Sequence, residues 1–99
     1  VSKAALNAYI RSISFVLGKK KIRINGVVPG NIIFEGSVWD NKNKKNPKEI
    51  QELLIEKVAL QKFGKPEDVS ELVYFLCSKE AEFITGGLFI SDGGQVRSF

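Results

Sequence analysis

Near the start of the chain, apolar residues recur at steps of three and four, which is the spacing of one helical face. The residues on this face are Leu6, Tyr9, Ile10, Ile13, Val16 and Leu17. The same segment carries a stripe of small residues, so we predict a helix with protein packed on two sides; the stripe is Ala5, Ala8 and Ser12. The helical pattern is already present at residue 1, with no capping residue before it. We predict that the helix ends at Gly18, which three lysines follow.

Two short apolar runs separated by helical patterns predict a pair of parallel strands. Residues 22–28 are rich in β-branched side chains and stop at a Pro-Gly turn, and the second run covers residues 88–91. Between them Asn46 and Pro47 predict the cap and first residue of a short helix to about residue 58, and Pro66 opens another helix. The order is helix, strand, loop with short helix, helix, strand, which predicts one end of a larger α/β sheet.

The segment 31–46 between the first strand and the short helix fits no regular pattern. It contains apolar residues, among them Phe34 and Trp39, but asparagine, glycine and lysine are too frequent for a predicted helix or strand. Long loops in compact domains are often lids or binding loops. We therefore predict an irregular loop with a functional role.

Composition narrows the class of protein. With 43% hydrophobic and 26% charged residues, the chain has the balance of a folded globular domain. We predict no membrane span and no secretion signal, because apolar stretches are short and no leader pattern occurs. Cys77 is the only cysteine and lies in an apolar run, so we predict a small buried residue in a reducing, cytoplasmic compartment. Histidine is absent, which argues against imidazole catalysis, and we predict no metal site.

The net charge of +4 comes largely from two lysine clusters, at residues 19–21 and 42–45. Nucleic-acid binding proteins usually add interleaved aromatic residues or a recognisable motif, and neither cluster has one. Solvated loops are therefore the favoured interpretation, and we predict no nucleic-acid partner. Salt-dependent binding of nucleic acid through these lysines is the weaker alternative.

Four stretches carry motifs that occur together, in this order, in one enzyme family. V-S-K-A-A-L matches a helix bearing Tyr-x-x-x-Lys, with Lys3 in the lysine position, and residues 23–30 match R-x-N-x-V-x-P-G. Residues 64–69, G-K-P-E-D-V, and residues 83–94, F-I-T-G-G-L-F-I-S-D-G-G, match a helix start and a last strand. Together they resemble the C-terminal part of the short-chain dehydrogenase/reductases. The resemblance covers residues 1–99 as a single segment and implies the C-terminal portion of a Rossmann-type, doubly wound parallel sheet.

The resemblance implies hydride transfer between NAD or NADP and a small-molecule carbonyl or alcohol substrate. In the family a tyrosine exchanges the alcohol proton, and its pKa, ordinarily near 10, has to fall for a phenolate to form near neutrality. A neighbouring lysine cation favours the phenolate and also binds the nicotinamide ribose. Lys3 is the residue implied for both the catalytic and the cofactor-binding role. Without the other motifs, the same residue would be interpreted as a solvent-facing lysine in a first helical turn.

The same resemblance implies where the nicotinamide lies. In the family the Pro-Gly turn after this strand is beside the nicotinamide, and the backbone amide two residues past the glycine holds its carboxamide. The implied cofactor-binding residues are Pro29, Gly30 and Ile32. In isolation, Pro-Gly after a strand would be interpreted as a turn. The family often has a threonine two residues further on, where this chain has Phe34, so that hydroxyl contact is lost or replaced.

Residues 31–58 take the place of the family's variable substrate-loop region. Phe34, Val38 and Trp39 could line an apolar substrate site beneath a mobile lid, or they could pack the loop onto its own scaffold. The sequence favours neither interpretation.

The family's tyrosine would stand two residues before Val1, and its Gly-rich dinucleotide turn still further upstream. We therefore expect a C-terminal fragment of an NAD(P)-dependent oxidoreductase, inactive as the isolated 99 residues. The alternative is a non-catalytic oligomerisation or binding module derived from the same fold. Because family members are commonly homotetramers, the resemblance also implies a homodimer or homotetramer formed through the first helix and the last strand.

Overall fold

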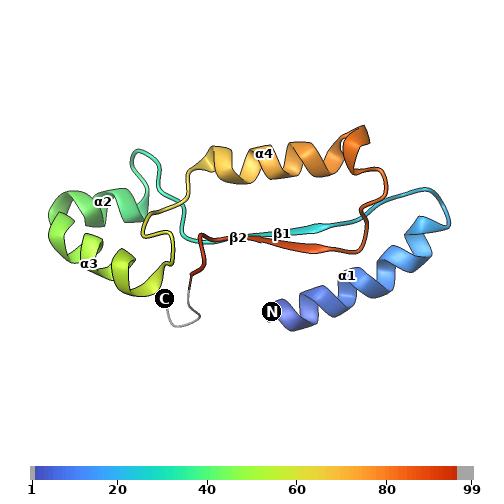
Figure 1. The fold of residues 1–99 in the computed structure, drawn as a ribbon, viewed down its shortest axis with the longest axis horizontal. Coiled ribbons are helices and arrows are strands. Elements are labelled where there is room, and N and C mark those ends of the chain that lie inside the picture. The colour runs from blue at the N-terminus through green and yellow to red at the C-terminus, as the bar shows by residue number, and fades with distance from the viewer. Residues whose placement is uncertain (1, 96–99) are drawn as a thin grey trace. The chain divides into compact units, whose positions relative to one another are not determined.

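The computed structural model describes residues 2–95 (Figure 1). Its helices are α1 (Lys3–Gly18), α2 (Val38–Lys45), α3 (Pro47–Lys57) and α4 (Pro66–Cys77), followed by a 3-10 turn, η1 (Lys79–Ala81). Its strands are β1 (Gly26–Pro29) and β2 (Leu88–Ser91). The described chain forms two compact units: residues up to Val28 with Glu71–Phe89, and Pro29–Ser70 with the residues from Ile90 onward.

β1 and β2 are hydrogen-bonded neighbours and run in parallel, as predicted. The amide of Gly26 donates to the carbonyl of Gly87 at 2.8 Å, and the amide of Gly30 donates to Ser91 at 2.9 Å. The predicted bounds of β2 are confirmed, whereas β1 is shorter than predicted and begins only at Gly26. The preceding residues bond with a loop instead of a strand, since Ile24 accepts from the amide of Gly86 at 2.7 Å.

Helix α1 begins with a cap that the apolar pattern did not predict. Ser2 has extended backbone geometry, and its Oγ accepts from the amide of Ala5 at 3.1 Å, which satisfies one of the orphan donors of the first turn. The expectation of an uncapped helix running from residue 1 is therefore wrong. On the buried side, Ile10 packs on β1, because a Cβ at Gly26 would lie only 2.5 Å from Ile10 Cδ1.

Within the first unit, α1 and residues 71–77 of α4 lie on opposite sides of the strands (Figure 1). The buried residues of this unit include Ile10, Leu76 and Ala81. The predicted second contact face of α1 is open in the described residues, since Ala8 and Ser12 are exposed and Phe15 is 70% exposed. One face of α1 is thus packed and the other is available.

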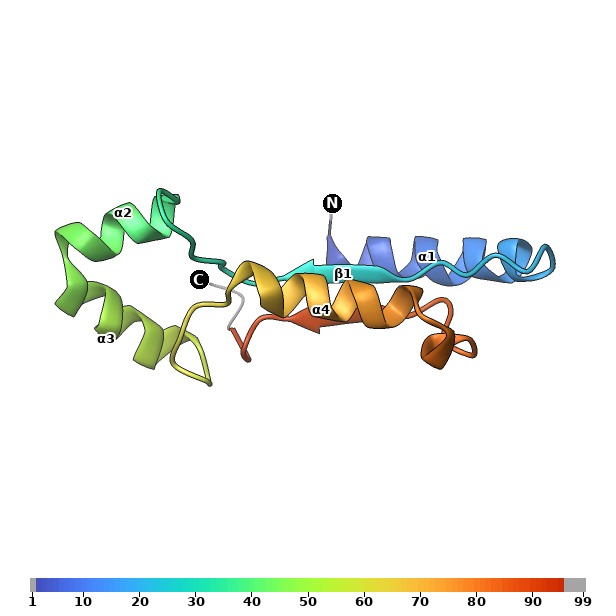
Figure 2. The same cartoon turned by 90° about the horizontal axis from the view of Figure 1, so that it is seen from above.

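In the second unit, α2 and α3 form a helical hairpin (Figure 2). The prediction that residues 31–46 are irregular is wrong for α2. Ser37 caps this helix by accepting from the amide of Asp40 at 3.2 Å, and Asp40 and Lys44 form an ion pair one turn apart at 3.1 Å. These local contacts outweigh the poor helix propensity of the asparagines. The hairpin closes on a core of Ile50, Leu54 and Val58, against which Trp39, Leu53 and Phe63 pack.

The predicted starts of α3 at Pro47 and α4 at Pro66 are confirmed. Asn46 occupies the cap position of α3, but its side chain makes no capping hydrogen bond. The prediction that Cys77 is buried is wrong. It is exposed at the last position of α4, where the neighbouring Leu76 faces the core instead. Among residues 2–95, no helix combines the length and the apolar character needed to cross a membrane.

Candidate functional site

The chain leaves β1 through a turn that only glycine fits. A Cβ at Gly30 would lie 2.6 Å from the Cβ and 2.8 Å from the Cα of Asp92. Both distances are too short for non-bonded carbon atoms, so a side chain at this position would clash with Asp92. The small residue lets this turn approach the end of β2 and pair with Ser91. Gly30 therefore has a packing requirement of its own, beside the cofactor contact implied by the resemblance.

Immediately after this turn, Ile32 forms a parallel bridge with Gly64. The amide of Ile33 donates to the carbonyl of Gly64 at 2.8 Å, and the amide of Gly64 donates to Asn31 at 3.0 Å. The bridge is made by the carbonyl of Asn31 and the amide of Ile33. The N–H and C=O of Ile32, which lies between them, therefore point away from Gly64. Together they offer one donor and one acceptor, which is the complement of a carboxamide. The second unit thus contains a main-chain edge whose donor and acceptor are both left open by the bridge to Gly64.

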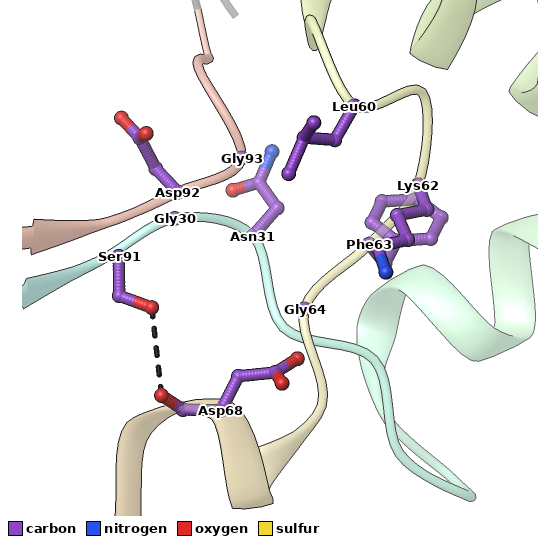
Figure 3. A pocket seen from close by; sticks show the side chains of 10 residues that line it. All are labelled: Gly30, Asn31, Leu60, Lys62, Phe63, Gly64, Asp68, Ser91, Asp92 and Gly93. Carbon is purple, nitrogen blue, oxygen red and sulfur yellow. Dashed lines mark hydrogen bonds between the residues drawn. The ribbon is translucent and has the colours of Figure 1, made fainter. Parts of the chain in front are cut away.

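A pocket of about 240 Å³ lies on the Gly64 side of this segment (Figure 3). Its lining residues are Gly30, Asn31, Leu60, Lys62, Phe63, Gly64, Asp68, Ser91, Asp92 and Gly93. Nδ2 of Asn31 is buried and has no hydrogen-bond partner among the described residues.

Asp68, the last residue of the G-K-P-E-D motif, has a structural role. Its Oδ2 accepts from the amide of Lys65, three residues earlier, at 2.7 Å, and so fixes the start of α4. Its carbonyl accepts from Ser91 Oγ at 3.5 Å, the contact drawn in Figure 3. Asp68 therefore joins the helix start to the end of β2.

The backbone next to Ile32 has a hydrogen-bond partner that the sequence did not predict. Gln95 Oε1 accepts from the backbone amide of Asn31 at 3.1 Å. Asn31 and Gln95 are 64 positions apart. No local pattern signals this contact, because a glutamine after Gly-Gly has no predicted partner. The contact forms because the fold places Gln95 beside Asn31.

The predicted lysine lies in the first unit. Lys3 is the first residue of α1, follows the Ser2 cap, and is exposed. The other predicted site residues, from Pro29 through Trp39, belong to the second unit. Within that unit, Pro29, Gly30 and Ile32 follow one another along the segment that leads from the end of β1 to the bridge with Gly64.

The three predicted loop residues have different environments. The Trp39 ring packs on Phe63 with centroids 5.2 Å apart, and Lys42 Nζ lies 4.7 Å from its centroid. Phe34 is 57% exposed and Val38 is 66% exposed. Trp39 thus anchors the hairpin to its own unit, while the other two present apolar surface.

A compact set of hydrogen bonds fixes the start of α2. Ser37 Oγ accepts from the amides of Phe34 and Asp40, each at 3.2 Å. Oδ2 of Asp40 in turn accepts from the amide of Gly36 at 2.9 Å. The Gly36 amide, and secondarily Lys44, lower the pKa of Asp40 below its usual value, because both stabilise the carboxylate. This arrangement holds the first residues of the substrate-loop region in place.

Two residues of the R-x-N-x-V-x-P-G motif act in the first unit. Arg23 Nη1 donates to the carbonyls of Leu76 at 2.7 Å and Ile84 at 3.1 Å. Asn25 Nδ2 donates to Ile84 at 3.0 Å, and its Oδ1 accepts from the amide of Gly87 at 3.0 Å. These side chains tie the entry of β1 to the end of α4 and to the loop before β2. In residues 2–95, no three His, Cys, Asp or Glu side chains gather into a candidate metal site.

Comparisons with known proteins show which family and which solved folds this chain is similar to. The family described as enoyl-(acyl carrier protein) reductase matches residues 1–95. The 7alpha-hydroxysteroid dehydrogenase of Escherichia coli K12 is 33% identical over 96 residues, covering 97% of this chain and 36% of that protein. A solved 7α-hydroxysteroid dehydrogenase complexed with NADH and 7-oxo glycochenodeoxycholic acid aligns with a TM-score of 0.73 and 32% identity, over 97% of this chain and 36% of the other.

A further solved structure extends this range of relatives. The L-sorbose reductase of Gluconobacter frateurii, complexed with NADPH and L-sorbose, has a TM-score of 0.76 and 26% identity, over 98% of this chain and 39% of its own. The chain spans about a third of the length of the curated relatives it matches. Over that third, its parallel strands and helices align with Rossmann-type oxidoreductases. The motif resemblance is confirmed: this chain belongs to the short-chain dehydrogenase/reductase family.

Proposed function

We propose that this chain supplies the nicotinamide edge and the substrate loop of an NAD(P)-dependent oxidoreductase. The reaction is hydride transfer between the cofactor and a small-molecule carbonyl or alcohol. The observation that carries the proposal is the outward-facing N–H and C=O of Ile32, which the bridge to Gly64 leaves available. These two groups would hold the carboxamide, and the bound cofactor supplies the hydride. Relatives in complex with NADH and with NADPH support either cofactor.

Lys3 would act through its charge. An ammonium group at this position favours the ionised form of a tyrosine one helical turn earlier, and it can donate to ribose hydroxyls. The exposed position of Lys3 at the start of α1 supports this role, because its side chain is open to a ligand.

The substrate loop would contact the apolar part of the substrate through Phe34 and Val38. Both are exposed, whereas Trp39 is committed to the hairpin core. Phe34 also stands where the family often has a threonine, so an apolar contact takes the place of a hydroxyl there. This assignment predicts a stronger effect on substrate KM from Phe34→Ala than from a change at an exposed lysine of α2.

The proposed assembly is a homodimer or homotetramer formed through α1 and β2. Exposed Ala5 and Ala8 would let another helix approach closely, and the exposed ring of Phe15 adds apolar area. Ala8→Arg should therefore shift the mass measured by light scattering toward the monomer. An unchanged mass would exclude α1 as the interface.

The test of the proposed function is turnover of NADH and NADPH with a panel of ketones, sugars and hydroxysteroids. We expect Lys3→Met to lower kcat by about 100-fold or more, the usual scale of acid–base assistance. Lys20→Met is the matched control, since Lys20 is another exposed lysine of the same unit. The 99 residues alone are expected to show no turnover, because the tyrosine position lies outside them. Equal activities of the two lysine variants would overturn the role of Lys3, and no turnover by the full protein would overturn the proposal.

A further inference from the structure

The backbone that carries Ile32 is held by one side chain from elsewhere in the chain. Three main-chain hydrogen bonds, made with Ser91 and Gly64, flank the segment from Gly30 to Ile33. The remaining contact is Gln95 Oε1, which accepts from the Asn31 amide at 3.1 Å. This oxygen also lies 2.9 Å from where a Cβ at Gly30 would stand, so the glutamine side chain lies directly against the turn.

Gln95 is itself firmly anchored. Its backbone forms an antiparallel bridge with Val58, which is only 4% exposed and belongs to the core that closes the α2–α3 hairpin. The two preceding glycines dock on the same segment, because Leu60 donates to Gly93 at 2.9 Å and Ala59 donates to Gly94 at 3.1 Å. The Gln95 side chain therefore reaches the turn from a rigid base.

We infer that Gln95 is a positioning residue for the cofactor edge. Its carbonyl oxygen fixes the Asn31 amide, and thereby the orientation of the next peptide group, whose N–H belongs to Ile32. Without an acceptor, the Asn31 amide would lose its partner in a part-buried position, and the turn would relax to find another. This inference rests on the proposed function, since it assumes that Ile32 holds the carboxamide.

The test compares two substitutions at this position in the full protein. Gln95→Leu keeps the size of the side chain but removes the acceptor, and Gln95→Glu keeps an oxygen at the same place. Gln51→Leu is the matched control, because Gln51 is an exposed residue of α3. Two quantities are measured: the Kd for NADH and NADPH from the fluorescence of the reduced nicotinamide, and hydrogen exchange at the Asn31 amide.

We expect Gln95→Leu to raise the Kd by about tenfold, the equivalent of one hydrogen bond, and to speed exchange at Asn31. Gln95→Glu should stay close to wild type in both measurements. A merely structural role is checked with Val58→Ala, which loosens the core beside Gln95 but keeps the acceptor. It should lower Tm at least as much as Gln95→Leu while changing the Kd far less.

Two results would overturn the inference while leaving the proposed function standing. In the first, Gln95→Leu binds NADH as tightly as wild type. In the second, the Leu and Glu substitutions weaken binding equally, which would show that the acceptor oxygen is not what matters. A wild-type protein that binds neither NADH nor NADPH is a different outcome. It would overturn the proposed function, and the inference with it, even if exchange at Asn31 responded to the substitutions.

Discussion

An asparagine lies just before β1 (Asn25, at the entry of the strand) and another just after it (Asn31, at the exit). Their side chains differ in hydrogen bonding. Before the strand, both amide atoms of Asn25 are bonded, to Ile84 and to Gly87. After the strand, Nδ2 of Asn31 has no partner among the described residues, while its backbone N–H and C=O bond to Gln95 and Gly64. Side chains hold the entry together. The exit is held mainly through the main chain, which is also the part of Ile32 that we propose binds the cofactor.

This difference separates stability from function along one short strand. A side chain that satisfies buried main-chain groups contributes to the free energy of unfolding, and its loss leaves those groups unpaired. A segment that presents main-chain groups to a ligand must leave them without intramolecular partners, so those groups add no hydrogen bond to the free energy of unfolding. Substitutions of the two asparagines should therefore differ in size and in sign.

The largest effect is expected at the entry. Asn25→Leu removes both side-chain hydrogen bonds and leaves the amide of Gly87 without its acceptor. We expect the free energy of unfolding to fall by about 3 kcal/mol, measured by urea denaturation. A loss below about 1 kcal/mol, the value of a single ordinary hydrogen bond, would contradict this account of the entry.

The next effect is at the exit turn. Gly30→Ala would push a methyl group into the backbone of Asp92, so we expect unfolding free energy to fall by about 2 kcal/mol. The matched control is Gly18→Ala, because nothing lies within 4 Å of a Cβ at that helical position. The control should instead raise stability by about 0.5–1 kcal/mol. If both substitutions stabilised the protein, the close approach of Gly30 to the end of β2 would be refuted.

A smaller effect of opposite sign is expected at Asn31. Asn31→Leu replaces the side-chain amide, whose buried Nδ2 has no partner among the described residues, with an apolar group of similar size. Removal of an unsatisfied donor should raise the unfolding free energy by about 1 kcal/mol, again by urea denaturation. Destabilisation as large as that of Asn25→Leu would mean that Nδ2 has a partner, and the contrast between the two asparagines would fail.

The smallest effect concerns the loop that follows the exit. The Gly36 amide and Lys44 lower the pKa of Asp40 below its ordinary value of 3.8, so the contribution of the Asp40 carboxylate to stability is fully present above that pH. That contribution is lost as pH falls through the still lower pKa of the folded state. Wild type should therefore lose more stability than Asp40→Asn on acidification below this value, measured by thermal unfolding across the pH range. If the thermal stabilities of the two proteins changed in parallel with pH, Asp40 would be excluded as the source of the loss of stability in acid.

The elements were predictable where local signals agree. Proline at the first helical position correctly marked α3 and α4, and the run of apolar residues before Asp92 correctly bounded β2. The prediction of an irregular loop is wrong because the Ser37 cap and the Asp40–Lys44 pair stabilise α2 despite its asparagines. Cys77 was misplaced because its run is apolar on every side, and only the packed helix shows which face is covered.

The site was predictable only in part, for a physical reason. The motif resemblance predicts Gly30 and Ile32 as site residues. It does not predict the residues that hold their backbone in place. Gly64 and Gln95 act on the turn through hydrogen bonds to main-chain atoms from distant positions. The Gly64 contacts use main-chain groups that every residue type but proline has, and the Gln95 contact joins residues 64 positions apart, so no spacing rule reveals either. They become visible when the fold brings the segments together.

Backbone amide NMR can show whether the main chain of Ile32 contacts the nicotinamide, as we propose. The protein is titrated with NADH and, separately, with ADP-ribose, which lacks the nicotinamide. The account predicts a saturable shift of the Ile32 amide signal with NADH, and little change at that signal with ADP-ribose. An Ile32 signal that stays fixed while NADH saturates other amides of the protein would contradict it.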